Sequence, residues 1–259
     1  MKYLVAIPVY NEERYLPGVL AAVTRHAEHI LVVNDGSTDA TAGLLAAYPH
    51  VHTITHSHNR GYGQSLINAF GFAAARGYDW IITLDCDEQH EPRQIPEFVA
   101  EARRDRADVI SGSRYLVAHP DDDPPPQQRR RINRTICELI KQILGLRLTD
   151  SFCGFKAQRV AAMQRLRLDE PGYAFPLQFW VQCMRAGLRV CEIPVRRIYL
   201  DEKRAFGGAL DDPAARLQHY LDVFTRELRR APLALDAQQT RALCRCSVRA
   251  PYRTWSWSA

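Results

Sequence analysis

An apolar run passes directly into a row of polar side chains in Trp80-Ile81-Ile82-Thr83-Leu84-Asp85-Cys86-Asp87-Glu88-Gln89-His90. The apolar part has the length and composition of a buried β-strand. Asp85 and Asp87 then stand one residue apart, so both carboxylates can face one hard divalent cation, which prefers oxygen ligands. Paired acids at a strand end also commonly begin a loop. The pair therefore indicates a cation site only together with the polar clusters at the other strand ends.

Two further apolar runs end in polar clusters of the same kind. These clusters are Pro8-Val9-Tyr10-Asn11-Glu12-Glu13 and Val33-Asn34-Asp35-Gly36-Ser37-Thr38-Asp39. Strand-like runs lie at 3–9, 29–33, 51–55, 80–84 and 108–111, separated by stretches with helical spacing. This alternation predicts an α/β fold with a mostly parallel central sheet between two helical layers, a Rossmann-like three-layer sandwich. Ligands of such sheets bind beyond the carboxyl ends of the strands, where the clusters should meet.

Three helices have recognisable signals. Asn11 stands where it would cap the first helix, with two glutamates in the opening turn. Apolar residues at helical spacing predict further helices at 132–144, ending at Gly145, and at 213–230. Both of these are basic at one end, which suits either packing on the core or contact with an anionic membrane surface.

The segment 118–131 interrupts this pattern with runs of aspartate, proline and arginine, which predicts a loop and an internal boundary. We therefore expect one domain over residues 1–230, made of the halves 1–115 and 116–230. A tail at 231–259 has no clear period.

The composition is that of an ordinary soluble globular protein, with 259 residues, 46% hydrophobic and 24% charged. Charge is unevenly distributed along the chain. Residues 1–110 carry 9 Lys and Arg against 14 Asp and Glu, whereas residues 111–259 carry 25 against 15. The acidic part suits a bound cation, and the arginine-rich part suits phosphates or an anionic membrane surface.

Seven cysteines, an odd number found mostly within apolar segments, indicate reduced thiols. The amino-terminal apolar run is too short for a signal peptide, and no run approaches the roughly 20 apolar residues of a membrane span. These features predict a cytoplasmic location, at most peripheral at the cytoplasmic face of a membrane.

The combination of motifs resembles the family 2 glycosyltransferases of the GT-A (nucleotide-diphospho-sugar transferase) fold, and among them the polyprenyl-phosphate (dolichol-phosphate) mannosyl- and glucosyltransferases. The likeness covers residues 1–115 and extends more loosely over 145–195. Besides the three strand-end clusters, it includes Asn59-Arg60-Gly61-Tyr62-Gly63, Gly112-Ser113-Arg114-Tyr115 and Asp150-Ser151-Phe152-Cys153-Gly154-Phe155.

The resemblance implies a metal-dependent hexosyltransferase, with 1–115 as the nucleotide-sugar and metal half and 116–230 as the acceptor half. By matching position, it implies nucleoside-binding roles for Pro8, Tyr10, Glu12 and Asp35. It also implies metal and diphosphate ligands at Asp85, Asp87 and Gln89, further donor-pocket contacts at Gly61 and Cys86, and catalytic roles for Asp87 and Arg114. The implied cofactor is Mg²⁺ or Mn²⁺, and the implied donor is of the GDP-mannose or UDP-glucose type; no nucleic-acid partner is expected.

The acceptor side carries an informative absence. Family members that glycosylate a hydroxyl usually present an acidic base near the start of a later helix, whereas the comparable stretch 173–180 has no carboxylate. A hydroxyl acceptor needs a base, but a phosphate is already anionic. The absence and the basic second half favour a lipid-phosphate acceptor, although Asp150 or Asp169-Glu170 could still supply a base. Lys203 and Arg204, in a loose match to the family's phosphate-closing loop, would bind the donor phosphates.

Three alternatives are weighed against this hypothesis. The first is a family 2 enzyme that acts on a hydroxyl of a glycan or another cell-envelope saccharide. The second is another nucleotide-using α/β enzyme, but the Gly-x-Gly-x-x-Gly turn and the Gly-x-x-x-x-Gly-Lys loop are both missing after the first strand. The third is a non-catalytic nucleotide-binding module, against which stands the presence of the full set of metal and nucleotide residues.

Overall fold

A computed structural model describes residues 1–199 and 207–230, and Lys203, Arg204 and the tail 231–259 lie outside these ranges. Seven strands form one sheet in the order β3-β2-β1-β4-β6-β5-β7. Their bounds are Tyr3–Val9 (β1), Ile30–Asn34 (β2), His52–Thr55 (β3), Trp80–Thr83 (β4), Val109–Ser113 (β5), Lys156–Arg159 (β6) and Val190–Pro194 (β7). Neighbouring strands are parallel except at β6, which is antiparallel to both β4 and β5.

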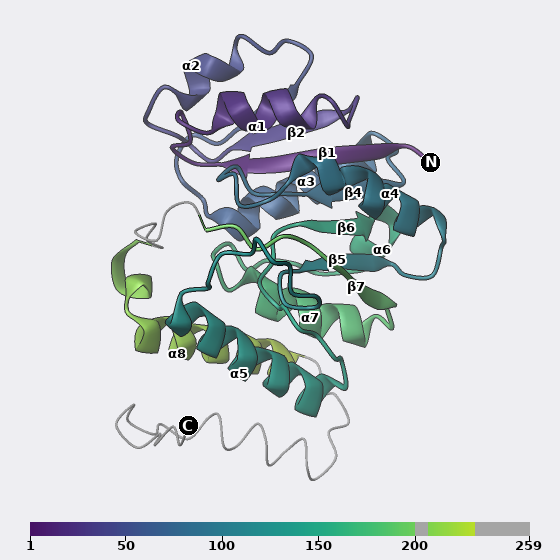
Figure 1. Cartoon of the computed structure of the whole chain (residues 1–259), viewed down its shortest axis with the longest axis vertical. Helices are drawn as coiled ribbons and strands as arrows, with labels where there is room; N and C mark the ends of the chain where they lie inside the picture. The colour runs from purple at the N-terminus through teal and green to yellow at the C-terminus, as the bar shows by residue number, and fades with distance from the viewer. Residues whose placement is uncertain (200–206, 231–259) are drawn as a thin grey trace.

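Helices cover both faces of this sheet (Figure 1). One apolar cluster joins the sheet to α1 (Leu16–Val23), α2 (Thr41–Leu45) and α4 (Ile95–Arg103), which follows the short 3₁₀ helix η1 (Pro92–Gln94). The other joins it to α3 (Tyr62–Ala75), α5 (Gln127–Leu144), α6 (Val160–Met163), α7 (Phe175–Arg185) and α8 (Pro213–Arg230), which follows η2 (Gly208–Asp211). In β1, Leu4 and Ala6 enter the second cluster and Val5 and Ile7 the first, because successive strand residues point to opposite faces. The expected three-layer α/β sandwich is confirmed.

The two helices predicted from helical spacing in the second half are present. Helix α5 buries Ile132, Ile136 and Ile140 and ends at Gly145, whose φ of 71° provides a left-handed cap. Helix α8 buries Tyr220 and Phe224. The apolar side of each helix therefore packs into the core, and α7 contacts both (Figure 1). Within the described ranges, no helix combines the length and the hydrophobicity that crossing a bilayer requires.

The prediction that Asn11 caps the first helix is wrong. Helix α1 begins at Leu16 after Tyr15, and no side chain caps it. Asn11 adopts a φ of 55° and its Oδ1 accepts a hydrogen bond from the Thr38 backbone N–H at 2.8 Å. The polar segment after β1 therefore binds the loop after β2. Helix α1 begins beyond this segment, at Leu16.

Asp108 connects three strands. It precedes β5 and binds Arg189, which precedes β7, and Arg159, the last residue of β6. Its carboxylate accepts hydrogen bonds from Arg189 Nε at 3.1 Å and from Arg159 Nε at 3.2 Å. The Arg189 guanidinium is the main cause that lowers the pKa of Asp108 from 3.8 to about 2. Three strands that are distant in sequence are therefore fastened at one edge.

We expect Asp108→Asn to lower the free energy of unfolding at pH 7 by about 1–2 kcal/mol, less than the full pKa shift would give because Arg189 is half exposed. The folded-state pKa lies below the unfolded value, so this stabilisation is complete above about pH 4 and is lost as the pH falls towards 2. Urea unfolding of both proteins across this range measures the difference. A difference that stays constant from pH 7 to pH 2 would contradict the assignment.

Candidate active site

The carboxyl ends of β1, β2, β4 and β5 lie at one edge of the sheet, and the antiparallel β6 begins at the same edge. Five polar segments consequently follow or precede strands there: 10–13, 35–41, 85–90, 114–115 and 150–155.

The segments after β1 and β2 are locked together. Glu13 Oε2 accepts from the Ala40 N–H at 2.9 Å, and the Glu12 N–H donates to Thr41 Oγ1 at 2.9 Å. Glu12 is buried, whereas Tyr10 is 44% exposed. The ring of Tyr10 is therefore available to a planar ligand at this edge.

Asp35 organises the turn before α3. Its carboxylate accepts from the backbone N–H groups of Arg60 and Gly61, both at 2.8 Å, and from His56 Nδ1 at 2.6 Å. The other ring nitrogen of His56 pairs with Asn68 Nδ2 at 2.7 Å. Asp35 and His56 are both buried, so this chain of polar contacts fixes the start of α3 against β2.

Asp85 lies directly over Gly154. A Cβ built on Gly154 would lie 2.3 Å from Asp85 Oδ2, so only glycine leaves room for the carboxylate. Tyr62 Oη donates to Asp85 Oδ1 at 3.0 Å, and burial, with Asp85 as the next cause, raises the pKa of Tyr62 well above its ordinary value. The Asp85 side chain nevertheless remains 32% exposed. The carboxylate therefore contacts Gly154 and Tyr62 on one side and solvent on the other.

His90 supports the same loop from within. The Asp85 backbone N–H lies 3.1 Å from His90 Nδ1, and the other ring nitrogen, Nε2, faces Cys153 Sγ at 3.8 Å. The Cys86 side chain is buried in the apolar cluster under this loop, which leaves the backbone of Cys86 at the edge of the sheet.

The residues after β4 fit a divalent cation. Asp87 is half-buried, and its Oδ1 accepts from the Gln89 N–H at 3.1 Å. Within the part of the chain that the structure describes, the Gln89 side-chain amide makes no hydrogen bond, and no group of three or more His, Cys, Asp or Glu is arranged to hold a metal. The two carboxylates of Asp85 and Asp87 and the amide oxygen of Gln89 are the hard oxygen donors that a divalent cation prefers, and substrate phosphates would have to complete such a ligand set.

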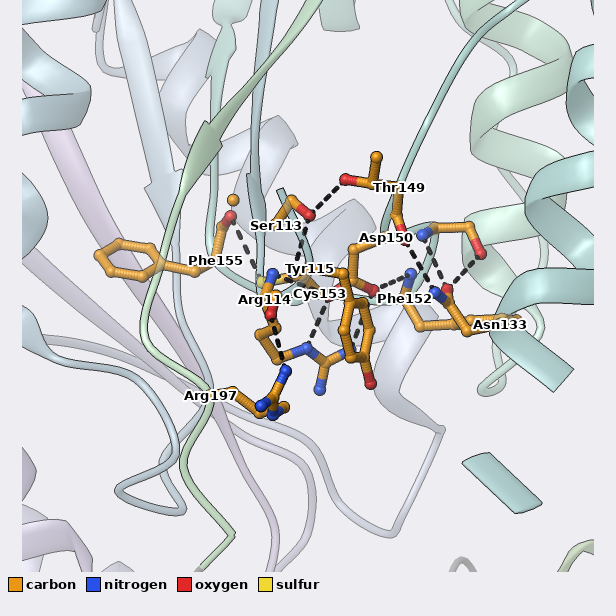
Figure 2. Close-up of polar contacts among 12 residues, drawn as sticks. Ser113, Arg114, Tyr115, Asn133, Thr149, Asp150, Phe152, Cys153, Phe155 and Arg197 are labelled. Carbon is orange, nitrogen blue, oxygen red and sulfur yellow. Dashed lines mark hydrogen bonds and ion pairs between the residues drawn. The ribbon is translucent and has the colours of Figure 1, made fainter. Parts of the chain in front are cut away.

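Arg114 follows β5 and makes a buried ion pair with Asp150 (Figure 2). Its Nε and Nη2 donate to Asp150 Oδ2 and Oδ1 at 2.7 and 3.0 Å. Burial alone would raise the pKa of Asp150, but the guanidinium outweighs this effect and holds that pKa below its ordinary value. Asp150 is fully buried and ionised, so it is not a free base.

Two neighbours hold Asp150 in place. Glu192 accepts from the backbone N–H groups of Thr149 and Asp150 at 2.9 and 3.0 Å. Asn133 Oδ1, on α5, accepts from the Ser151 N–H at 3.0 Å (Figure 2). Burial raises the pKa of Glu192.

Three guanidinium groups surround the ring of Tyr115. Arg130 lies 3.8 Å from the ring centroid, and Arg114 and Arg197 each lie 5.7 Å from it. We call Arg114, Arg130 and Arg197 the arginine cluster. The predicted boundary loop takes part in it, since Arg197 Nε donates to the Asp123 carbonyl at 2.6 Å.

The other two candidate bases are also engaged. Asp169 accepts from Gln178 Nε2 and from Arg230 Nη1, both at 2.7 Å. Glu170 is buried and paired with Arg226 of α8. The first turn of α7 has no acidic residue. The carboxylates that sequence reasoning left open as bases are therefore held in ion pairs.

Comparison with known proteins agrees with this arrangement. Residues 4–167 match the sequence model described as glycosyl transferase family 2. The undecaprenyl-phosphate mannosyltransferase of Micrococcus luteus is 29% identical over 228 residues, which cover 82% of this chain and 90% of that protein. The polyprenol monophosphomannose synthase of Mycolicibacterium smegmatis is 30% identical over 205 residues, 74% of this chain and 76% of that protein.

Solved structures agree on the fold. Glucosyl-3-phosphoglycerate synthase from Mycobacterium tuberculosis, solved with uridine diphosphate, superposes with a TM-score of 0.68 at 16% identity, covering 90% of this chain and 82% of that one. The same enzyme was also solved with Mn²⁺, UDP-glucose and phosphoglyceric acid, and that structure gives a TM-score of 0.60.

The sheet and the polar edge define a glycosyltransferase of the GT-A fold. The chain belongs to glycosyl transferase family 2, because the family match extends over well over half of its length. The resemblance inferred from the motifs is thereby confirmed.

Several residues that shape the site were missed by sequence reasoning. Arg130 and Arg197 each lie beside another arginine without an assigned role, and no local pattern in the sequence predicts the partners of Glu192. Tyr62 lies within the quoted segment 59–63, and an aromatic residue between two glycines is the signal that could have singled out its side chain.

We expect Asp150→Asn to lower the free energy of unfolding by about 3 kcal/mol, because it leaves a mostly buried guanidinium without its counter-charge. Urea denaturation measures this change. The matched control is Glu138→Gln, which breaks the exposed Lys141–Glu138 pair on α5 and should cost less than about 0.5 kcal/mol. Equal costs for the two variants would show that the Arg114–Asp150 pair is not a buried anchor.

Proposed function

We propose that this chain is an inverting, metal-dependent glycosyltransferase that moves a hexose from a nucleoside-diphosphate sugar to polyprenyl phosphate. The observation that carries this proposal is the arginine cluster at the same edge of the sheet as the open Asp85 carboxylate, combined with the engaged state of Asp150, Asp169 and Glu170. The names of the two relatives, which include undecaprenyl phosphate and polyprenol monophosphomannose, support the same acceptor class.

Residues 1–115 would form the donor half. Tyr10 would contact the base, with Pro8, Glu12 and Asp35 shaping the nucleoside pocket and Gly61 lining it. Asp85, Asp87 and Gln89 would hold Mg²⁺ or Mn²⁺, and the Mn²⁺ found with UDP-glucose in a structure of the same fold supports a divalent cation as the cofactor. When bound, the cation would neutralise charge on the departing nucleoside diphosphate. Lys203 and Arg204, for which the resemblance implies contacts to the same phosphates, lie outside the described residues.

Residues 116–230 would form the acceptor half together with Arg114. A phosphate oxygen attacks the anomeric carbon opposite the departing diphosphate and has no proton to lose, so no base is needed. The cations of the arginine cluster would bind and orient that phosphate. The polyprenyl chain would bring the protein into peripheral contact with a membrane. The relatives' names favour mannose as the transferred sugar, so GDP-mannose is the first donor to screen and UDP-glucose the second.

Asp85→Asn should reduce sugar transfer by at least about 100-fold with the fold intact, since one of two carboxylates for the cation is lost. The assay is release of nucleoside diphosphate from GDP-mannose and UDP-glucose with Mg²⁺ or Mn²⁺, with and without polyprenyl phosphate. Asp222→Asn, on the exposed side of α8, is the matched control. Full activity of the Asp85 variant would refute the metal site, and stimulation only by a hydroxyl acceptor would refute the acceptor class.

Arg130→Gln should raise the KM for polyprenyl phosphate by about 10-fold, because one of three cations near the acceptor phosphate is removed. The KM for the donor should stay unchanged. Arg131→Gln, which alters the neighbouring exposed arginine on α5, should leave both constants near the wild-type values. Steady-state kinetics with each substrate varied separately tests this, and an equal effect of both substitutions would argue for general surface charge instead.

A further inference from the structure

Tyr62 connects the metal-binding carboxylate to a loop far along the chain. Its hydroxyl donates to Asp85 Oδ1 at 3.0 Å. Its ring stacks on Tyr173, with the planes 17° apart and the centroids separated by 6.0 Å. Tyr173 precedes α7 and begins the stretch 173–180, where family members that glycosylate a hydroxyl usually have an acidic base.

The backbone around Tyr62 cannot shift independently of that loop. A Cβ on Gly61 would lie 2.3 Å from the Pro171 carbonyl oxygen, and one on Gly63 would lie 2.2 Å from that of Glu170. The Gln64 N–H also donates to the Pro171 carbonyl at 3.1 Å. The first turn of α3 and residues 170–173 therefore pack as one unit.

The loop is in turn anchored to the rest of the acceptor half. Glu170 is buried and pairs with Arg226 of α8, and Gln178 of α7 donates to both Asp169 and Glu227 at 2.7 and 2.9 Å. Tyr62 is thus supported through residues 170–173 by two helices of the other half of the chain.

Two contacts fix the orientation of the Asp85 side chain. Gly154 supports the carboxylate from below, and the Tyr62 hydroxyl occupies one acceptor position of Oδ1. These contacts restrict the rotamer of Asp85 while its side chain stays 32% exposed. A carboxylate held in one orientation loses less conformational entropy when it binds a cation.

We propose that Tyr62 is a positioning residue that orients Asp85 for the divalent cation and links the metal site to residues 170–173. The proposal rests on the proposed function for the identity of the metal ligands. Tyr62 acts through Asp85. The hydroxyl supplies the orientation, and the stacked ring keeps the hydroxyl in place.

The test compares Tyr62→Phe with Tyr3→Phe. Both remove one hydroxyl, and Tyr3 Oη donates to the His26 carbonyl at 2.7 Å near the amino end of β1, away from the metal residues. Mn²⁺ binding is followed by electron paramagnetic resonance, with Mn²⁺ alone and with Mn²⁺ plus UDP or GDP. We expect the Kd for Mn²⁺ to rise about 10-fold in Tyr62→Phe and to be unchanged in Tyr3→Phe. Urea unfolding and circular dichroism verify that both variants are folded.

Turnover gives an independent readout. In Tyr62→Phe, the metal concentration for half-maximal activity should rise about 10-fold, while kcat at saturating metal stays within about threefold of wild type. Tyr173→Ala should produce part of this shift and Tyr173→Phe almost none, since phenylalanine keeps the stack. A loss of kcat without a change in metal affinity would overturn the positioning role.

The outcomes separate this inference from the proposed function. If wild type transfers sugar and Tyr62→Phe binds Mn²⁺ like wild type, the inference fails and the function stands. If Mn²⁺ affinity falls in Tyr62→Phe but no polyprenyl phosphate is glycosylated, the inference stands and the function fails. If wild type binds no Mn²⁺ under any condition, both the metal site and this inference are overturned.

Discussion

The buried ion pair between Arg114 and Asp150 is the contact on which the arrangement of the site depends. A fully buried carboxylate is stable only if a counter-charge and hydrogen-bond donors surround it, and Arg114 supplies the charge. Glu192 and Asn133 then hold the backbone beside it. Because Arg114 directly follows β5, Asn133 lies on α5 and Glu192 lies on β7, this one requirement ties together three elements that are distant in sequence.

The reversed direction of β6 extends this requirement to the metal residues. An antiparallel strand starts at the edge where its parallel neighbours end, so the segment from Asp150 to Gly154 reaches the end of β4. Gly154 can then lie beneath Asp85, and the missing side chain leaves room for its carboxylate. The ion pair and the carboxylate are thus fixed by the same five-residue segment. A substitution in the Arg114–Asp150 pair would therefore shift the backbone at Gly154 and with it the Asp85 carboxylate.

Sequence reasoning found most of the fold and the outline of the site, because both are written in local patterns. The apolar runs matched the strands closely, and the rule that ligands bind at the carboxyl ends of parallel strands placed the three clusters at one edge. The hydrogen-bond partners of the polar side chains could not be predicted from local patterns. Asn11 bonds to Thr38, and Asp35 to His56, across 27 and 21 residues, and no local propensity encodes such pairs. Asn11 failed as a cap because a tertiary partner competed for the same side chain.

The distribution of charge acquires a physical meaning in the folded chain. The excess of acid in the first 110 residues includes Asp85 and Asp87, and the excess of arginine beyond them includes Arg130 and Arg197. Many of the basic residues are balanced by nearby acids, as Arg226 and Arg230 are by Glu170 and Asp169. Those pairs balance the charge of the spare carboxylates, whereas the three guanidinium groups of the arginine cluster lie around Tyr115. An edge that keeps an open carboxylate on one side and cations on the other suits two phosphate-bearing ligands, one through a cation and one directly.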